Sequence, residues 1–179
     1  MGIIRSDSRT ERFRSLGRST ENDQERKRLV EDNAGDARLL RETLLEANPH
    51  VRLHVVGDGD EAMAFLRYQE PYVNAPRPDV ILLDLNLPKT GGLEVLASVK
   101  ANPWLKTIPL IVLTTSQSPE DIVSSYRLLA SCYLAKPAAL KEFEKLVLSL
   151  DDLWLRRAAL PKHMDNGCGS SSLSLPPNE

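Results

Sequence analysis

Polar side chains suited to phosphoryl chemistry directly follow four apolar runs of the chain. They are Glu31-Asp32, Asp84, Thr114-Thr115 and Lys136-Pro137. Clustered carboxylates resist ionising together unless a cation joins them. Mg²⁺ binds through one or two carboxylates together with water and phosphate oxygens, while an ammonium and a hydroxyl supply donors to the phosphoryl oxygens. The set therefore predicts an acidic, magnesium-dependent phosphoryl site.

Asp84 is the strongest candidate for the nucleophile of such a site. It follows Val80-Ile81-Leu82-Leu83, an unbroken apolar run typical of a strand buried on both faces. Carboxylates attack phosphorus in known covalent mechanisms. Each residue taken alone also has a purely structural interpretation. Asp84 could cap the end of a strand, Thr114 could be a β-branched strand residue, and Lys136 could be a solvated loop lysine. Their joint placement favours the chemical reading, with Thr114 and Lys136 contacting the phosphoryl group.

Strand-like and helix-like patterns alternate in the segment that must position these residues. The expected strands lie near 29–30, 51–55, 80–83, 110–113 and 132–135, and each is followed by residues at helical spacing. Five such repeats predict an α/β fold with a parallel sheet and helices on both faces. Function in such sheets gathers at the carboxyl ends of the strands, which is where the polar residues fall.

The first expected strand conflicts with a central place in the sheet. Glu25-Arg26-Lys27-Arg28 precedes only Leu29-Val30. Burying such charges is costly unless they are paired or reach out to water. We therefore expect a very short first strand, or one that starts at the open end of the sheet.

Composition and length predict one domain with two polar tails. Apolar residues make up 41% of 179 residues, enough for one core. Residues 1–24 are expected to be a disordered polar tail, 25–160 the domain with an extended C-terminal helix, and 161–179 a second disordered tail.

Charge, hydropathy and cysteine content predict the cellular setting. A formal net charge of −2 argues against bulk attraction to nucleic acid or an anionic membrane. We find no apolar run near the ~20 residues that span a bilayer. Cys132 and Cys168 lie in unlike contexts, so we expect a reducing, cytoplasmic setting.

The motifs resemble the signature of response-regulator receiver domains of two-component systems. The matching residues are Val30-Glu31-Asp32-Asn33, 80–88, Leu113-Thr114-Thr115-Ser116 and Tyr133-Leu134-Ala135-Lys136-Pro137. The resemblance covers about residues 26–150. Within the family the chain is most similar to the small single-domain regulators paired with phytochrome-type histidine kinases. That narrower likeness rests on Gly35-Asp36-Ala37-Arg38, the 71–78 loop, Leu85-Asn86-Leu87-Pro88-Lys89 and Leu153-Trp154-Leu155.

The resemblance implies a flavodoxin-like (βα)5 fold with strand order 2-1-3-4-5. It implies that Asp84 accepts a phosphoryl group from a histidine kinase. It also implies that Asp32, Asp84 and the main-chain carbonyl of Asn86 bind Mg²⁺, with Glu31 supporting the metal through water.

The resemblance also assigns the switch. Tyr133 would turn inward when Thr114 is drawn to the phosphoryl group, and Asn86 and Ser116 would tune the lifetime of the phosphoaspartate. The chain departs from the pattern at Gly91, where many relatives have Asp. We expect that change to alter the start of a helix and to leave the chemistry intact.

The last expected helix is long enough to extend past the sheet. From about Ala139 to Ala159 it would measure ~30 Å, against ~17 Å for a five-residue strand. Its end carries Leu153, Trp154 and Leu155, and exposed apolar surface of this kind marks a contact. We therefore expect a homodimer through the last helix, with Leu153 and Trp154 in the contact.

Other classes of function have less support in the sequence. A phosphatase of the haloacid dehalogenase type also uses Asp, Mg²⁺, Thr and Lys, but it needs a second Asp two residues after the nucleophile. Asn86 stands there, and no room remains for a cap domain, so we expect no enzyme. A receiver-like scaffold without phosphorylation and a phosphorelay intermediate stay open. A DNA-binding output is not expected, because no second domain follows residue 160.

Overall fold

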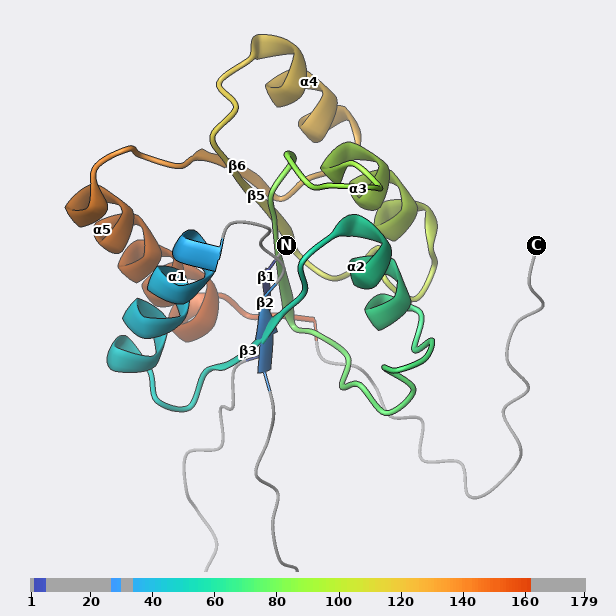
Figure 1. The fold of residues 1–179 in the computed structure, drawn as a ribbon, viewed down its shortest axis with the longest axis horizontal. Coiled ribbons are helices and arrows are strands. Elements are labelled where there is room, and N and C mark those ends of the chain that lie inside the picture. The colour runs from blue at the N-terminus through green and yellow to red at the C-terminus, as the bar shows by residue number, and fades with distance from the viewer. Residues whose placement is uncertain (1, 6–26, 30–33, 162–179) are drawn as a thin grey trace, which may run out of the picture.

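The computed structural model describes residues 2–5, 27–29 and 34–161 of the chain (Figure 1). Its strands are β1 Gly2–Arg5, β2 Lys27–Leu29, β3 Arg52–Val55, β4 Val80–Leu83, β5 Leu110–Thr114 and β6 Cys132–Ala135. Its helices are α1 Ala34–Ala47, α2 Gly59–Leu66, α3 Gly92–Ala101, α4 Pro119–Arg127 and α5 Leu140–Leu150, continued by the π-helical η1 Asp151–Arg157.

The second half of the sheet is the parallel array that the sequence predicts. β4 pairs with β5 in the register Ile81↔Leu110, and β5 pairs with β6 in the register Ile111↔Cys132. All the residues of β4 and β5 are buried, because helices cover both sides of these strands. The carboxyl ends of the three strands therefore meet at one rim.

Alternate residues of the buried strands enter two different cores. Ile81 and Leu83 pack in a cluster with α2 and α3, whereas Val80 and Leu82 pack in a cluster with α1 and α5. Figure 1 shows the same division, with α1 and α5 on one side of the sheet and α2 and α3 on the other. The predicted α/β architecture, with helices on both faces, is confirmed.

The first half of the sheet differs from the prediction of five strands in the order 2-1-3-4-5. The described sheet has six strands in the order β2-β3-β1-β4-β5-β6, with an additional pairing of β2 with β1. β1 runs antiparallel to β4 in the register Ile3↔Ile81. The segment before Glu31-Asp32 instead forms β2, which pairs in parallel with β3.

The physical reason for this correction is the composition of the two segments. A central strand is covered on both faces and requires apolar residues. Gly2-Ile3-Ile4 meets that requirement and Lys27-Arg28 does not. Gly2–Arg5, which belongs to the expected disordered polar tail 1–24, forms β1 in the described sheet, while residue 1, residues 6–24 and residues 162–179 lie outside the described part. The three-residue length of β2 agrees with the expected very short strand.

The end of the chain is helical as expected, but its contacts differ. α5 continues into η1, where Ala158 donates its amide to the carbonyl of Leu153 at 2.8 Å. Leu155 is buried against the core that α1 and α5 share, and Trp154 packs on the same core, whereas Leu153 is 56% exposed. The expectation that all three residues extend past the sheet is wrong for Leu155, because η1 folds back onto the end of α1.

Asp151 fixes this docking of η1. Its side chain is buried, accepts a bond from Asn48 Nδ2 at 3.1 Å and pairs with Arg156 Nε at 2.5 Å. Arg156 also donates to the main-chain carbonyl of Ala47. Within the described residues no helix is long and apolar enough to cross a bilayer.

Candidate functional site

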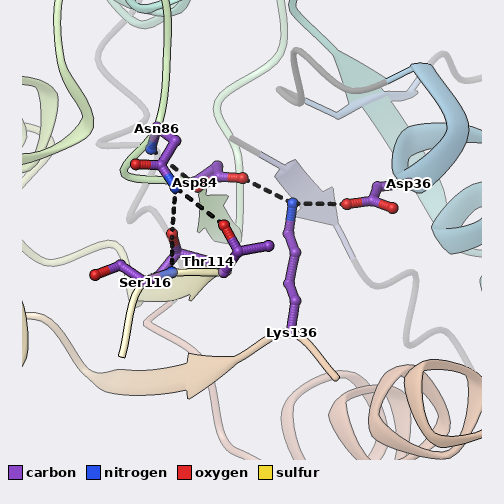
Figure 2. A network of polar contacts seen from close by, with 7 residues as sticks. Asp36, Asp84, Asn86, Thr114, Ser116 and Lys136 are labelled. Carbon is purple, nitrogen blue, oxygen red and sulfur yellow. Dashed lines mark hydrogen bonds and ion pairs between the residues drawn. The ribbon is translucent and has the colours of Figure 1, made fainter. Parts of the chain in front are cut away.

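Asp84, Thr114 and Lys136 meet at the carboxyl ends of β4, β5 and β6 (Figure 2). Asp84 directly follows β4, Thr114 is the last residue of β5, and Lys136 directly follows β6. The amide of Lys136 donates to the carbonyl of Thr114 at 2.7 Å, which extends the parallel pairing by one residue. The rule that polar residues gather at this end of a parallel sheet places all three correctly.

A buried ion pair joins the predicted nucleophile to the predicted lysine. Lys136 Nζ lies 2.7 Å from Asp84 Oδ2, and the two side chains are 4% and 5% exposed. Burial raises the pKa of the Asp84 carboxyl, but hydrogen bonds from Lys136 and from the amide of Asn86, with the charge of Lys136, outweigh it. The net effect holds the pKa of Asp84 below its ordinary value. Asp84 is therefore ionised at neutral pH, as a nucleophile requires.

Asn86 and Thr114 complete the surroundings of Asp84. The amide of Asn86 donates to Asp84 Oδ1 at 3.0 Å. Asn86 Nδ2 lies 3.1 Å from the hydroxyl oxygen of Thr115 and 3.5 Å from that of Thr114. Asn86 is exposed and Thr114 is fully buried. Asn86 thus stands at the solvent side of the rim.

Ser116 connects this rim to the neighbouring helix and to Tyr133. Its amide donates to Thr114 Oγ1 at 3.3 Å, and its carbonyl accepts a bond from the Tyr133 hydroxyl at 3.0 Å. Its own hydroxyl donates to Asp121 Oδ2 at 2.5 Å, in the first turn of α4. A movement of Thr114 would therefore displace Ser116 and change its hydrogen bonds to Tyr133 and to Asp121 at the start of α4.

Asp36 joins the site although its sequence pattern did not assign it a role there. It lies in the first turn of α1, and its Oδ2 is 3.1 Å from Lys136 Nζ. In Figure 2 the ammonium of Lys136 stands between the carboxylates of Asp84 and Asp36. The available signal was its place in the first turn of a helix that starts just after Glu31-Asp32.

Glu31 and Asp32, the predicted metal residues, lie outside the described part of the chain. Among the described residues, no group of three or more His, Cys, Asp or Glu side chains is placed to hold a metal. The described donors nevertheless fit a hard cation. The Asp84 carboxylate stands at the rim beside the exposed Asn86, and carboxylate and carbonyl oxygens suit Mg²⁺.

A sequence profile described as the response regulator receiver domain matches residues 28–148. That span covers well over half of the chain and contains the whole polar rim. The chain belongs to the response regulator receiver domain family.

Relatives of this receiver are close in sequence and in structure. Response regulator Rcp1 of a Synechocystis strain is 49% identical over 74% of this chain and 90% of its own length. The probable methanogenesis regulatory protein FilR2 of Methanothrix harundinacea is 35% identical over 71% of this chain and 81% of its own length.

Two solved structures resemble the receiver across the same region. The phosphorylated cyanobacterial phytochrome response regulator RcpA has a TM-score of 0.73 at 48% identity, covering 75% of this chain and 96% of that one. The Mn²⁺-bound form of Rcp1 has a TM-score of 0.72 at 49% identity, with the same coverage. The resemblance to phytochrome-associated regulators is thus found in sequence and fold alike.

Proposed function

We propose that this receiver accepts a phosphoryl group on Asp84 from the phosphohistidine of a histidine kinase of the phytochrome type. The observation that carries the proposal is the buried pair of Asp84 with Lys136, set beside the hydroxyl of Thr114 at one rim. The similarity to RcpA, a cyanobacterial phytochrome response regulator solved in its phosphorylated form, supports it.

In the proposed step, a carboxylate oxygen of Asp84 attacks phosphorus. The bond from phosphorus to the imidazole nitrogen breaks, an oxygen–phosphorus bond forms, and the leaving imidazole takes a proton from solvent. Asp84 needs no base for this step, because its lowered pKa keeps it ionised. Lys136 turns its ammonium to the new phosphoryl oxygens, and the Thr114 hydroxyl donates to one of them.

Mg²⁺ is the metal that we propose for this site. Asp84, the main-chain carbonyl of Asn86 and Asp32 would hold it, with Glu31 acting through water. When bound, the ion neutralises charge on the phosphoryl oxygens. The Mn²⁺-bound form of Rcp1 supports a divalent cation in a related receiver.

Phosphorylation would act on the rest of the chain through the bonds of Ser116. It adds about −1.5 to −2 charge to the rim. As Thr114 moves toward that charge, the bond from the Ser116 amide to Thr114 pulls the segment after β5. This movement alters the contacts of Tyr133 and Asp121, and a partner that prefers the new arrangement shifts the population toward it.

We propose signalling by protein contact, in the cytoplasm, without turnover of an external phosphate ester. Asn86 stands where a phosphatase of the same chemistry would need a second acid. A relay that passes the phosphoryl group onward uses the same first step. A scaffold role without phosphorylation is the alternative, and the buried Asp84–Lys136 pair argues against it, because a buried ion pair adds little to stability alone.

A homodimer through the last helix is part of the proposal. Exposed apolar side chains remain on α5 and η1, namely Leu140, Leu148 and Leu153. Trp154 of η1 is half-buried. Light scattering of the wild type and Leu153→Asp would test this contact. We expect a dimer that Leu153→Asp dissociates, and a wild type that stays monomeric at high micromolar concentration, phosphorylated or not, would contradict it.

Phosphotransfer from an autophosphorylated kinase tests the main proposal. A phytochrome-type histidine kinase carrying labelled phosphohistidine is mixed with the wild type or with Asp84→Asn in the presence of Mg²⁺. We expect label to move to the wild type alone, and to stay on the kinase when the metal is chelated. Equal labelling of both proteins would contradict Asp84 as the acceptor.

A further inference from the structure

We infer that Asp36 is a positioning residue that holds Lys136 in the resting receiver and competes with the phosphoryl group for its ammonium. This inference rests on the proposed function. It assigns a role in the same reaction to Asp36 of α1. This residue lies outside the three sequence motifs that contain Asp84, Thr114 and Lys136.

The position of Asp36 follows from the packing of α1. Ala37 and Leu40 are buried in the core shared with α5. Residues four apart on a helix lie on one face, so Asp36 stands above Leu40 at the end of α1 that meets the rim. Its side chain is 33% exposed. A carboxylate in a first helical turn is favoured by the helix dipole, which helps to hold the Asp36 side chain at this end of α1.

Lys136 is shared between two carboxylates in this arrangement. Its ammonium lies 2.7 Å from Asp84 Oδ2 and 3.1 Å from Asp36 Oδ2 (Figure 2). The lysine leaves the end of β6, the first carboxylate the end of β4, and the second the start of α1. Lys136 thus ties α1 to the strand ends while Asp84 carries no phosphoryl group.

Phosphorylation changes the balance between Asp84 and Asp36, the two carboxylates that bind Lys136 among the described residues. The phosphoryl group brings about −1.5 to −2 charge to the Asp84 side of the ammonium. The ammonium then moves toward the phosphoryl oxygens and away from Asp36. Asp36 opposes that movement, because it attracts the same ammonium and repels the phosphoryl oxygens. Removing its charge should therefore strengthen the binding of an anion at Asp84.

Binding of beryllofluoride, an anionic mimic of the phosphoryl group, tests this inference. The affinity is measured by fluorine NMR in saturating Mg²⁺ for the wild type, Asp36→Asn, Asp36→Glu and Glu46→Gln. Glu46 is an exposed acid near the other end of α1 and serves as the matched control. We expect Asp36→Asn to bind about three- to ten-fold more tightly, as for the loss of one partly exposed charge interaction. Asp36→Glu and Glu46→Gln should stay near the wild type.

A double-mutant cycle with Lys136→Met establishes whether Asp36 acts through the lysine. The gain from Asp36→Asn should disappear in the Lys136→Met background. If Lys136→Met binds no beryllofluoride, the test is instead the nitrogen NMR signal of the Lys136 ammonium in proteins that keep the lysine. It must shift on Asp36→Asn and stay unchanged on Glu46→Gln. The inference is overturned if Asp36→Asn raises the beryllofluoride affinity equally in the Lys136→Met background. It is also overturned if the Lys136 ammonium signal does not shift on Asp36→Asn.

A Mg²⁺ titration without beryllofluoride separates positioning from metal binding. We expect Asp36→Asn to keep the Mg²⁺ affinity of the wild type within about two-fold, since the carboxylates proposed to hold the cation are those of Asp32 and Asp84. A loss of Mg²⁺ affinity would make Asp36 a metal ligand and overturn the inference. If the wild type itself binds no beryllofluoride, the proposed function fails. If it binds and Asp36→Asn leaves the affinity unchanged, only the role of Asp36 fails.

Discussion

Lys136 Nζ lies 2.7 Å from Asp84 Oδ2, and neither side chain is more than 5% exposed. Taking two charges out of water is costly, and their attraction offsets that cost only while both are present. The pair is therefore a weak source of stability when intact and a large source of instability when broken. A new negative charge at Asp84 would therefore directly change the interaction of Asp84 with Lys136.

Replacing Lys136 by Met should destabilise the fold in a pH-dependent way. We expect a loss of about 3–5 kcal/mol at pH 7, because a buried carboxylate is left without its partner. Without the ammonium, burial raises the pKa of Asp84, so the loss should shrink as the pH falls and Asp84 takes up a proton. Urea unfolding at several pH values measures the effect.

In the wild type, the contribution of Asp84 to the free energy of unfolding should decrease as the pH falls, whereas the loss caused by Lys136→Met should shrink. The folded pKa of Asp84 is lowered, so the stability from the ionised form is complete above the ordinary value of about 3.9. It is lost as the pH falls through the folded value.

Lys145→Met is the matched control for Lys136→Met, since Lys145 is an exposed partner of Glu142. A loss with Lys136→Met no larger than with Lys145→Met would contradict the account.

Two neighbouring glycines should respond in opposite directions to a small side chain. A Cβ on Gly92 would lie 2.3 Å from the carbonyl oxygen of Asp84, whereas a Cβ on Gly91 would meet nothing within 4 Å. Gly92→Ala should therefore cost about 1–3 kcal/mol by overpacking and slow phosphorylation of Asp84. Gly91 is the N-cap of α3 and has no side-chain capping bond. Gly91→Ser should add a few tenths of a kcal/mol, about what a capping hydroxyl gains over glycine.

Thermal and urea unfolding of both glycine variants checks this prediction. Similar effects at the two positions would mean that the close approach of α3 to the end of β4 is not what requires Gly92.

The hydroxyl of Tyr133 should hold the segment between β5 and α4. It donates to the carbonyl of Ser116 at 3.0 Å. Tyr133→Phe should cost about 1 kcal/mol, the net value of one hydrogen bond, and should speed amide exchange at residues 115–118. Tyr126→Phe is the control, because Tyr126 is a half-exposed tyrosine on α4. Equal exchange in the two variants would exclude a holding role for the Tyr133 hydroxyl.

Much of this arrangement could be predicted from short stretches of sequence. The apolar runs of β4 and β5 indicated the buried strands, and Ser118-Pro119 marked the start of α4, where the Ser118 hydroxyl oxygen accepts a hydrogen bond from the amide of Asp121. These features depend on neighbouring residues alone. The same logic placed Asp84 and Lys136 at one rim, because parallel strands share their carboxyl ends.

The features that escaped prediction depend on contacts between distant segments. The pairing of Gly2–Arg5 with β4 joins residues about eighty positions apart, and no local pattern indicates it. The contact of Asp36 with Lys136 spans one hundred residues. Leu155 was expected to be exposed on a regular helix, but the wider π-helical turn of η1 changes the face that it presents.

Asp151 and Asp152 should differ sharply although they are adjacent. Asp151 is buried and bonded to Asn48 and Arg156, whereas Asp152 is exposed and pairs with Arg157 on the surface. Asp151→Ala should cost about 2 kcal/mol, because it leaves buried partners unsatisfied and loosens η1 from α1. Asp152→Ala should change stability by less than about 0.5 kcal/mol. Urea unfolding compares them, and equal losses would contradict the docking role of Asp151.

The most direct test of the central claim is the intact mass of the chain after incubation with Mg²⁺ and acetyl phosphate. Wild type and Asp84→Asn are compared under conditions in which both are shown to be folded. We predict that the wild type gains the mass of one phosphoryl group, which is stable in acid and lost in base, and that Asp84→Asn gains none. A folded wild type that gains nothing, or a variant that gains as much as the wild type, would contradict phosphorylation at Asp84.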